Sequence, residues 1–166
     1  MFKKPMKKII LILFLISNLT FGQTKGKIQF GKNVTLEWEI QNFDKTKHTF
    51  EYCLENKFKY LCKIDNQQWF GSDNGIEFPK NELTKLNLKI GTQNYNLETS
   101  KMFNPNFSGH LSKHQFKLVS NQKHQILYSF YSDGAGTYTA HWKIENGKAE
   151  RIILSRNEEY FEWQTE

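Results

Sequence analysis

The sequence predicts an all-β protein, an antiparallel sandwich or barrel of about eight to ten short strands. Apolar and polar side chains alternate at every second position through most of the chain after residue 27, as in strands with one buried face. Stretches of turn-forming residues, such as Asn146-Gly147, separate these alternating runs. Proline-rich linkers and internal repeats are not found. The pattern is typical of hairpins stacked over a shared apolar interior.

The first 22 residues have the pattern of a secretory signal peptide. Four lysines among residues 1–8 precede the uninterrupted apolar run IILILFLI at residues 9–16, and small residues follow before Gly22. This run is much shorter than the roughly 20 apolar residues that span a bilayer. We therefore expect cleavage after Gly22, export to the periplasm or beyond, and no stable membrane anchor on the mature chain. The alternative is a buried N-terminal strand or helix.

The charge of the chain changes when this segment is removed. Removing its 22 residues and four lysines from the 166 leaves 144 residues and lowers the net charge from +6 to +2. The basic pI therefore reflects the leader, and a nucleic-acid partner is not expected. We expect residues 23–166 to form a single β-rich domain with an acidic, aromatic C-terminal tail. The 14 Phe, 7 Tyr and 4 Trp predict an interior or a pocket built of rings.

The alternating segments follow one another along the chain. In the first of them Leu36 and Trp38 point to one face, and Glu37 and Glu39 point to the other. The predicted strands with clear alternation lie at residues 34–40, 84–90, 95–99, 116–119, 125–131 and 137–144. The segment 125–131 is apolar on both faces, which predicts a central strand of its sheet.

The segment 50–64 fits either a β-hairpin or a helix by its apolar spacing, and its cysteines decide between them. In an oxidising compartment Cys53 and Cys62 are expected to form a disulfide bond. On a helix the two would be separated by about 13 Å along the axis, too far for a bridge. We therefore predict a hairpin with the loop 56–59 and with Cys53 directly opposite Cys62.

The stretch SDGAG at residues 132–136 resembles a ligand-cradling loop at first sight. A phosphate-binding loop needs a helix N-terminus and usually a following lysine, and strands are predicted on both sides of this stretch. We therefore interpret it as a reversal in which Gly134 and Gly136 supply positive φ angles. Asp133 is then a turn residue that accepts local N–H groups, and a ligand-binding role is the alternative.

Asn146-Gly147 is the strongest hairpin signal in the chain. With these two residues as the loop, Ala140 faces Ile153 and Trp142 faces Arg151 on an otherwise apolar face that also carries Tyr138. The Arg151 stem could pack on the indole and leave the guanidinium in solvent. Alternatively, it is a cation in an aromatic cavity that awaits an anionic ligand. The candidate ligand-binding residues are Trp142, Arg151, Asp133 and Tyr138.

The tail RNEEYFEWQTE at residues 156–166 mixes aromatic residues with four glutamates. Its rings could cap an open end of the β core while the acidic side chains face water. Alternatively, they form a docking strip, since aromatic residues are enriched at interface hot spots. The candidate partner-binding residues are Tyr160, Phe161 and Trp163.

Catalytic and metal-binding motifs are weak. His110 and His114 are four residues apart, but on a strand that spacing separates them by about 13 Å. No nucleophile elbow, cofactor motif or metal-ligand spacing is found, so no cofactor and no metal ion are expected. We expect an exported binding protein for a protein partner or a small anionic or apolar ligand, including a lipid-like ligand inside a barrel. The alternative is a periplasmic hydrolase with fold-assembled His, Asp and Glu residues, which a buried His beside a carboxylate in a cleft would indicate.

Overall fold

The computed structural model describes residues 24–72, 77–106, 109–131 and 136–164. Within these ranges eleven strands form three antiparallel sheets. The helical segments are the short 3-10 turns η1 (Lys45–Lys47), η2 (Lys113–Gln115) and η4 (Glu158–Gln164). In the described part of the chain, no helix has the length and apolar character needed to cross a membrane. The predicted signal peptide at residues 1–22, together with Asp133 and Gly134, lies outside the described residues.

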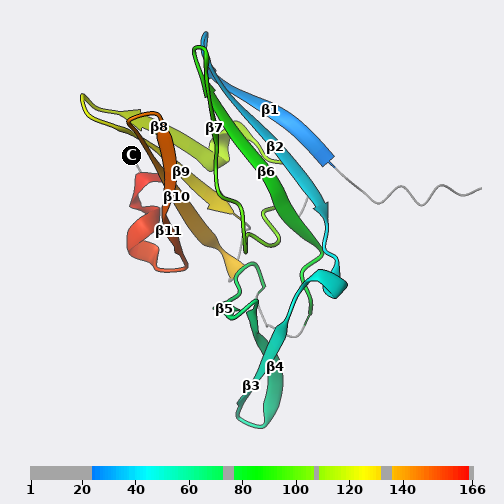
Figure 1. Cartoon of the computed structure of the whole chain (residues 1–166). Coiled ribbons are helices and arrows are strands. Elements are labelled where there is room, and N and C mark those ends of the chain that lie inside the picture. The colour runs from blue at the N-terminus through cyan, green and yellow to red at the C-terminus, as the bar shows by residue number, and fades with distance from the viewer. Residues whose placement is uncertain (1–23, 73–76, 107–108, 132–135, 165–166) are drawn as a thin grey trace, which may run out of the picture.

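Two four-stranded sheets form the body of the protein (Figure 1). The first has the order β1-β2-β6-β7, with β1 (Thr24–Gly31), β2 (Val34–Asn42), β6 (Asn81–Ile90) and β7 (Gln93–Asn96). The second has the order β11-β10-β9-β8, with β8 (Phe116–Ser120), β9 (Gln125–Tyr131), β10 (Tyr138–Glu145) and β11 (Lys148–Ser155). The predicted central position of the segment 125–131 is confirmed, because β9 lies between β8 and β10.

The two sheets face each other across one apolar core. Leu36 and Trp38 of β2 belong to the same buried cluster as Leu127 of β9 and Trp142 of β10. Alternate residues on each strand fill this cluster, as the period-two pattern predicts. The all-β prediction is thus confirmed, and of its two forms the protein adopts the sandwich.

A third, smaller sheet lies beyond one end of the sandwich, and its hairpin projects away from it (Figure 1). It has the order β3-β4-β5, with β3 (Phe50–Glu55), β4 (Phe58–Ile64) and β5 (Gln67–Gln68). Its base is packed around a separate buried cluster of Leu61, Ile64, Trp69 and Phe103. The hairpin tip extends past this cluster, so its side chains have few neighbours.

The β10–β11 hairpin follows the predicted register near its turn and departs from it farther away. Trp142 pairs with Arg151, as the Asn146-Gly147 loop predicts. A β-bulge between His141 and Trp142 then shifts the register, so Ala140 pairs with Leu154 instead of the predicted Ile153. One extra residue in one strand accounts for this error, because it displaces every later pair by one position.

The reversal predicted between residues 131 and 138 is confirmed, since β9 and β10 form an antiparallel pair in which Tyr131 faces Tyr138. The role predicted for Gly136 is wrong, because its φ does not lie in the positive region. Instead, a Cβ at Gly136 would lie 2.5 Å from the backbone nitrogen of Ser72. The glycine allows the backbone of residues 71–72 to approach, and its carbonyl accepts a 2.7 Å hydrogen bond from the Gly71 N–H.

Candidate functional site

The β3–β4 hairpin has a two-residue loop, Asn56-Lys57, in place of the predicted four-residue loop 56–59. Both loop residues have positive φ, 48° and 70°, as in a type I′ turn. Glu55 therefore pairs with Phe58, and Cys53 pairs with Tyr60 instead of Cys62. The predicted bend is in the right place, but the register is offset by two positions.

The predicted disulfide bond between Cys53 and Cys62 is confirmed, with a Cα–Cα distance of 5.7 Å. It joins the strands diagonally, because a bulge opposite Glu51 and Tyr52 leaves Cys62 without a directly opposite residue. The Glu51 carboxylate lies close to both sulfur atoms. A metal ion would need free thiolates, and here the two sulfurs are bonded to each other. We therefore interpret this group as a covalent staple of the hairpin.

Large apolar side chains at the hairpin tip are exposed to solvent. Leu54 is 76% exposed, Phe58 is 75% exposed, and Tyr52 is 45% exposed. Cross-strand partners share a face, so Tyr52 and Leu54 lie on one face of the hairpin, and Phe58 lies on the opposite face beside Glu55. The ammonium of Lys59 stands 4.5 Å from the centre of the Tyr52 ring, on the first face. Exposed apolar groups on both faces of a projecting hairpin are typical of a contact surface.

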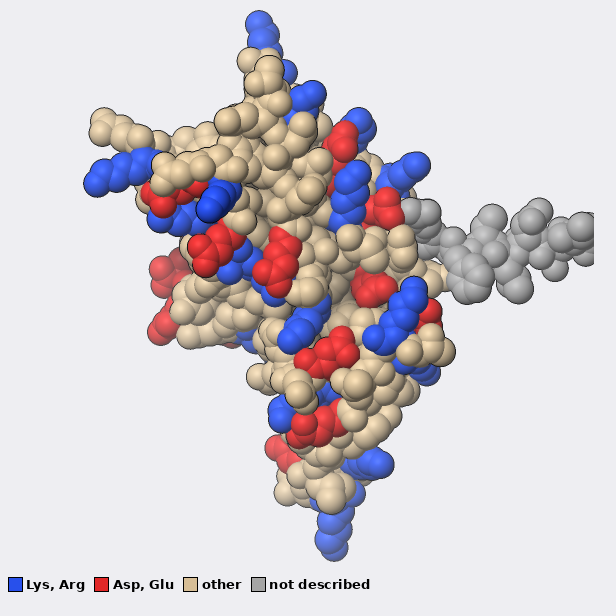
Figure 2. Space-filling view, viewed as in Figure 1, with Lys and Arg blue, Asp and Glu red and all other residues tan. Residues whose placement is uncertain are grey.

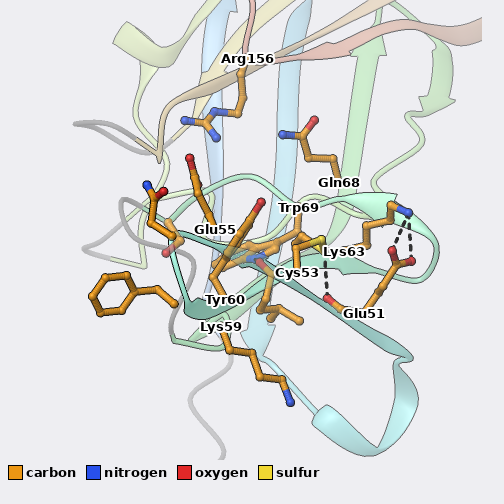
Figure 3. A pocket seen from close by; sticks show the side chains of 14 residues that line it. Glu51, Cys53, Glu55, Lys59, Tyr60, Lys63, Gln68, Trp69 and Arg156 are labelled. Carbon is orange, nitrogen blue, oxygen red and sulfur yellow. Dashed lines mark hydrogen bonds and ion pairs between the residues drawn. A yellow bond between two sulfur atoms is a disulfide. The ribbon is translucent and has the colours of Figure 1, made fainter.

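The second face of the hairpin borders a hollow of about 800 Å³ (Figure 3). Tyr60, the disulfide and Trp69 form its apolar wall, and Arg156 lies across the hollow from the hairpin (Figure 3). Trp69 is fixed in place because its indole N–H donates to the Leu61 carbonyl at 2.9 Å. The hollow has the size and the mixed lining of sites that bind small molecules or side chains.

The charges around the hollow are of both signs. Glu51 forms an ion pair with Lys63 across the strands at 2.9 Å. The Glu55 carboxylate has no hydrogen-bond or ion-pair partner within the described part of the chain, although the main chain of Glu55 pairs with Phe58. Acidic and basic residues are also interspersed over the face of the molecule seen in Figure 2. The hairpin would therefore bind a charged ligand through a specific pair with Glu55, and not through a broad electrostatic field of one sign.

Three of the four residues predicted to bind a ligand are brought together, at the junction between β10, β11 and the segment 97–103. The Trp142 indole N–H donates to the Glu98 carbonyl at 3.0 Å, and the Tyr138 hydroxyl donates to the Phe103 carbonyl at 2.8 Å. The Arg151 guanidinium donates to the Ser100 carbonyl at 2.7 Å and pairs with the Glu98 carboxylate at 2.9 Å. These polar groups fasten the segment 97–103 to the second sheet. Asp133 is outside the described residues.

The tail rings lie on the outer face of the second sheet, not at an open end of the core. Phe161 packs edge-on against Phe130 at 5.7 Å between ring centroids, and Tyr160 is 6.1 Å from His141. Trp163 contacts Tyr128 at 5.9 Å. The rings thus cover a face of their own sheet, although Tyr160 is still 37% exposed. Burial beneath them lowers the pKa of His141, partly offset by a hydrogen bond with the Tyr160 backbone.

His48 was not singled out by the sequence, yet it lies between two carboxylates. Its Nδ1 is 2.7 Å from Asp65 at the β4–β5 turn, and its Nε2 is 3.4 Å from Glu82 on β6. The ring stacks on Phe43 at 4.6 Å. These groups border a hollow of about 280 Å³, the arrangement that favours the hydrolase alternative. However, Nε2 is fully buried, so a substrate cannot reach it in this structure.

Two kinds of functional candidate were thus missed. Residues 48, 65 and 82 are too far apart in sequence for any spacing rule to connect them. The exposed tip carried a usable signal, because Tyr52, Leu54 and Phe58 place apolar groups on both faces of a hairpin. His110 and His114 form no metal site in the described structure, since His110 packs against Trp38 and His114 belongs to η2.

Comparison with known proteins was made at three levels. No family model, no curated protein and no solved structure matches this chain.

Proposed function

We propose that this protein binds another protein through the projecting β3–β4 hairpin. The observation that carries this proposal is the exposure of Leu54 and Phe58, each about three-quarters accessible, at the tip of a disulfide-stapled hairpin. Burying a large apolar side chain contributes about 1.5–3 kcal/mol, so these two side chains could supply much of the affinity of an interface. The tail rings are less suited to the role, because they already contact their own sheet.

The proposed setting is outside the cytoplasm. The Cys53–Cys62 disulfide is compatible with an extracellular protein, since such bonds persist in oxidising compartments. The predicted signal sequence supports the same location.

The test is capture of a partner from the periplasmic and extracellular fractions of the organism that makes the protein. The variant carries Leu54→Ser and Phe58→Ser together. The matched control carries Val119→Ser and Ile152→Ser, which remove two other exposed apolar side chains, 42% and 44% accessible, from the sandwich strands β8 and β11. We expect the hairpin variant to bind the captured protein at least about tenfold more weakly, while the control binds normally. Equal capture by both variants would refute the proposal.

The second candidate is hydrolysis at His48, which its 2.7 Å contact with Asp65 beside a hollow favours. In such a site the Asp65 carboxylate would orient the ring, and Nε2 would have to become accessible before it could activate water. Turnover of chromogenic ester, phosphate or glycoside substrates that disappears in His48→Ala would support it. Equal activity of the unsubstituted protein and the His48→Ala variant would exclude His48 as the general base.

A further inference from the structure

Along one side, the main chain of β3 offers hydrogen-bonding groups that pair with no other strand among the described residues. In the three-stranded sheet β3 is an edge, and β4 is its partner. Residues that flank a two-residue hairpin loop form a hydrogen-bonded pair, so Glu55 and Cys53 direct their N–H and C=O groups toward β4. The alternate residues, Tyr52 and Leu54, direct theirs away from the sheet.

This edge has little of the protection that usually keeps a strand from pairing with another chain. Natural edge strands are blunted by charged residues, especially lysine, by proline, by bulges or by very short length. Among the described sheets the other edges have such features: β1 carries Lys25 and Lys27, β8 carries Lys117, β11 carries Lys148 and Arg151, β7 has four residues and β5 has two. β3 has six residues, FEYCLE, and its charged residues are the glutamates Glu51 and Glu55; it has no basic residue or proline, and the extra residue of its bulge belongs to β4.

The side chains of β3 define what a neighbouring strand would meet on each face. Tyr52 and Leu54 present an exposed apolar face. Glu51, Cys53 and Glu55 lie on the other face and line the 800 Å³ hollow. A strand added beside β3 would therefore place alternate side chains on the apolar face, and the others next to the two carboxylates at the mouth of the hollow (Figure 3).

We propose that β3 binds an extended segment of the partner protein by strand addition, and that this segment alternates apolar residues with lysine or arginine. Its main chain pairs with Tyr52 and Leu54, its apolar side chains cover theirs, and a basic side chain pairs with Glu55. The inference rests on the proposed function and adds its mode and the chemistry of the partner. Glu55 is the main charge determinant, because Glu51 is already bonded to Lys63.

The first test uses a defined probe, an acetylated and amidated hexapeptide of alternating valine and lysine, with the full protein. At about 90% occupancy, hydrogen exchange of the Tyr52 and Leu54 amides should slow about tenfold, since only the free fraction exchanges. A peptide with the same residues in two blocks, three valines and then three lysines, is the control. Strand addition is overturned if both peptides bind alike, or if the alternating peptide binds without protecting these two amides. The serine variants test the protein-binding function separately.

A second test separates main-chain pairing from side-chain contact. Leu54→Pro removes an N–H that faces solvent, and Leu54→Ala removes the side chain and keeps the N–H. We expect the proline variant to bind the alternating peptide at least about tenfold more weakly than the alanine variant. Slow exchange of the Cys53 and Tyr60 amides in both variants verifies that the hairpin is intact. Equal affinities would overturn the proposal.

A third test concerns charge and the rival occupant. Glu55→Lys should weaken binding of the valine-lysine peptide and favour one of alternating valine and glutamate, and Glu150→Lys on β11 should do neither. If the charge reversal leaves the preference unchanged, the basic partner is excluded.

Sedimentation of the protein alone tests self-pairing. Concentration-dependent dimers that Leu54→Pro abolishes would replace the partner segment with a second copy of this chain.

Discussion

Removal of the disulfide by Cys53→Ala and Cys62→Ala is expected to loosen the hairpin far more than the sandwich. The bond closes a loop of ten residues, counting both cysteines. In the chain-entropy model such a loop constrains the unfolded state by about 2.7 kcal/mol, or about a hundredfold in an opening equilibrium. Because the tip has few neighbours beyond the cluster around Trp69, this free energy should govern local opening of β3 and β4.

The assay is native-state hydrogen exchange, read for the backbone amides at positions 53 and 60 in the hairpin and for those of Leu36 and Leu127 in the sandwich core. We expect hairpin exchange to accelerate by up to about a hundredfold and core exchange to change much less, provided that the hairpin opens without the rest of the fold. The urea midpoint gives the global effect in the same samples. Unchanged exchange of the hairpin amides would refute the view that the disulfide determines its rigidity. Equal acceleration everywhere would show that hairpin and sandwich unfold together.

Three further changes test separate parts of the structure. Lys57→Gly should raise the free energy of unfolding by about 0.5–1 kcal/mol in urea titration, since Lys57 has a φ of 70° in the turn and glycine adopts this angle without strain. Gly136→Ala should cost about 1–3 kcal/mol in the same assay, because its Cβ would lie 2.5 Å from the Ser72 nitrogen. The pKa of His141 is lowered from 6.5 in the folded state, so the unfolded state binds its proton more tightly. The free energy of unfolding is therefore highest above that pH and decreases as the pH falls toward the lower folded-state pKa. His141→Phe should therefore flatten the change in urea midpoint between about pH 7.5 and 5.

The strands were predictable because both main sheets bury one face, which imposes a period of two on the sequence. The Asn146-Gly147 turn was equally predictable, since these residue types favour positive φ and determine which residues of the two strands pair next to the turn. The bulge next to Trp142 could not be predicted, because it depends on how the strand must twist to cover the core. Likewise, Asn56-Lys57 forms the same kind of turn with a lysine at a position where glycine is usual, so the loop was predicted to be too long.

The candidate site was harder to predict than the fold. The sequence identified the cysteine pair, but the exposure of Leu54 and Phe58 is set by what fails to cover them in three dimensions. Conversely, the sequence offered no partner for the Arg151 guanidinium, so Arg151 was a candidate for binding a ligand. In the structure this guanidinium pairs with Glu98 and donates to the Ser100 carbonyl, both in a segment distant along the chain. Contacts across more than forty positions carry no local pattern, so burial and pairing of these residues follow only from the assembled fold.

The hairpin combines an open edge with several restraints on its own conformation, and this combination bears on function. The disulfide joins its strands, the Trp69 indole bonds to Leu61 at the base, and His48 connects Asp65 of the small sheet to Glu82 of the sandwich. A flexible edge would lose conformational entropy on binding, and that loss would offset much of the main-chain hydrogen bonding. Here the restraint is already present in the free protein, so strand addition can retain more of its binding free energy. The same restraint holds Tyr52 and Leu54 on one face of β3 and Glu55 on the other, so a partner strand must alternate apolar and basic side chains to match them.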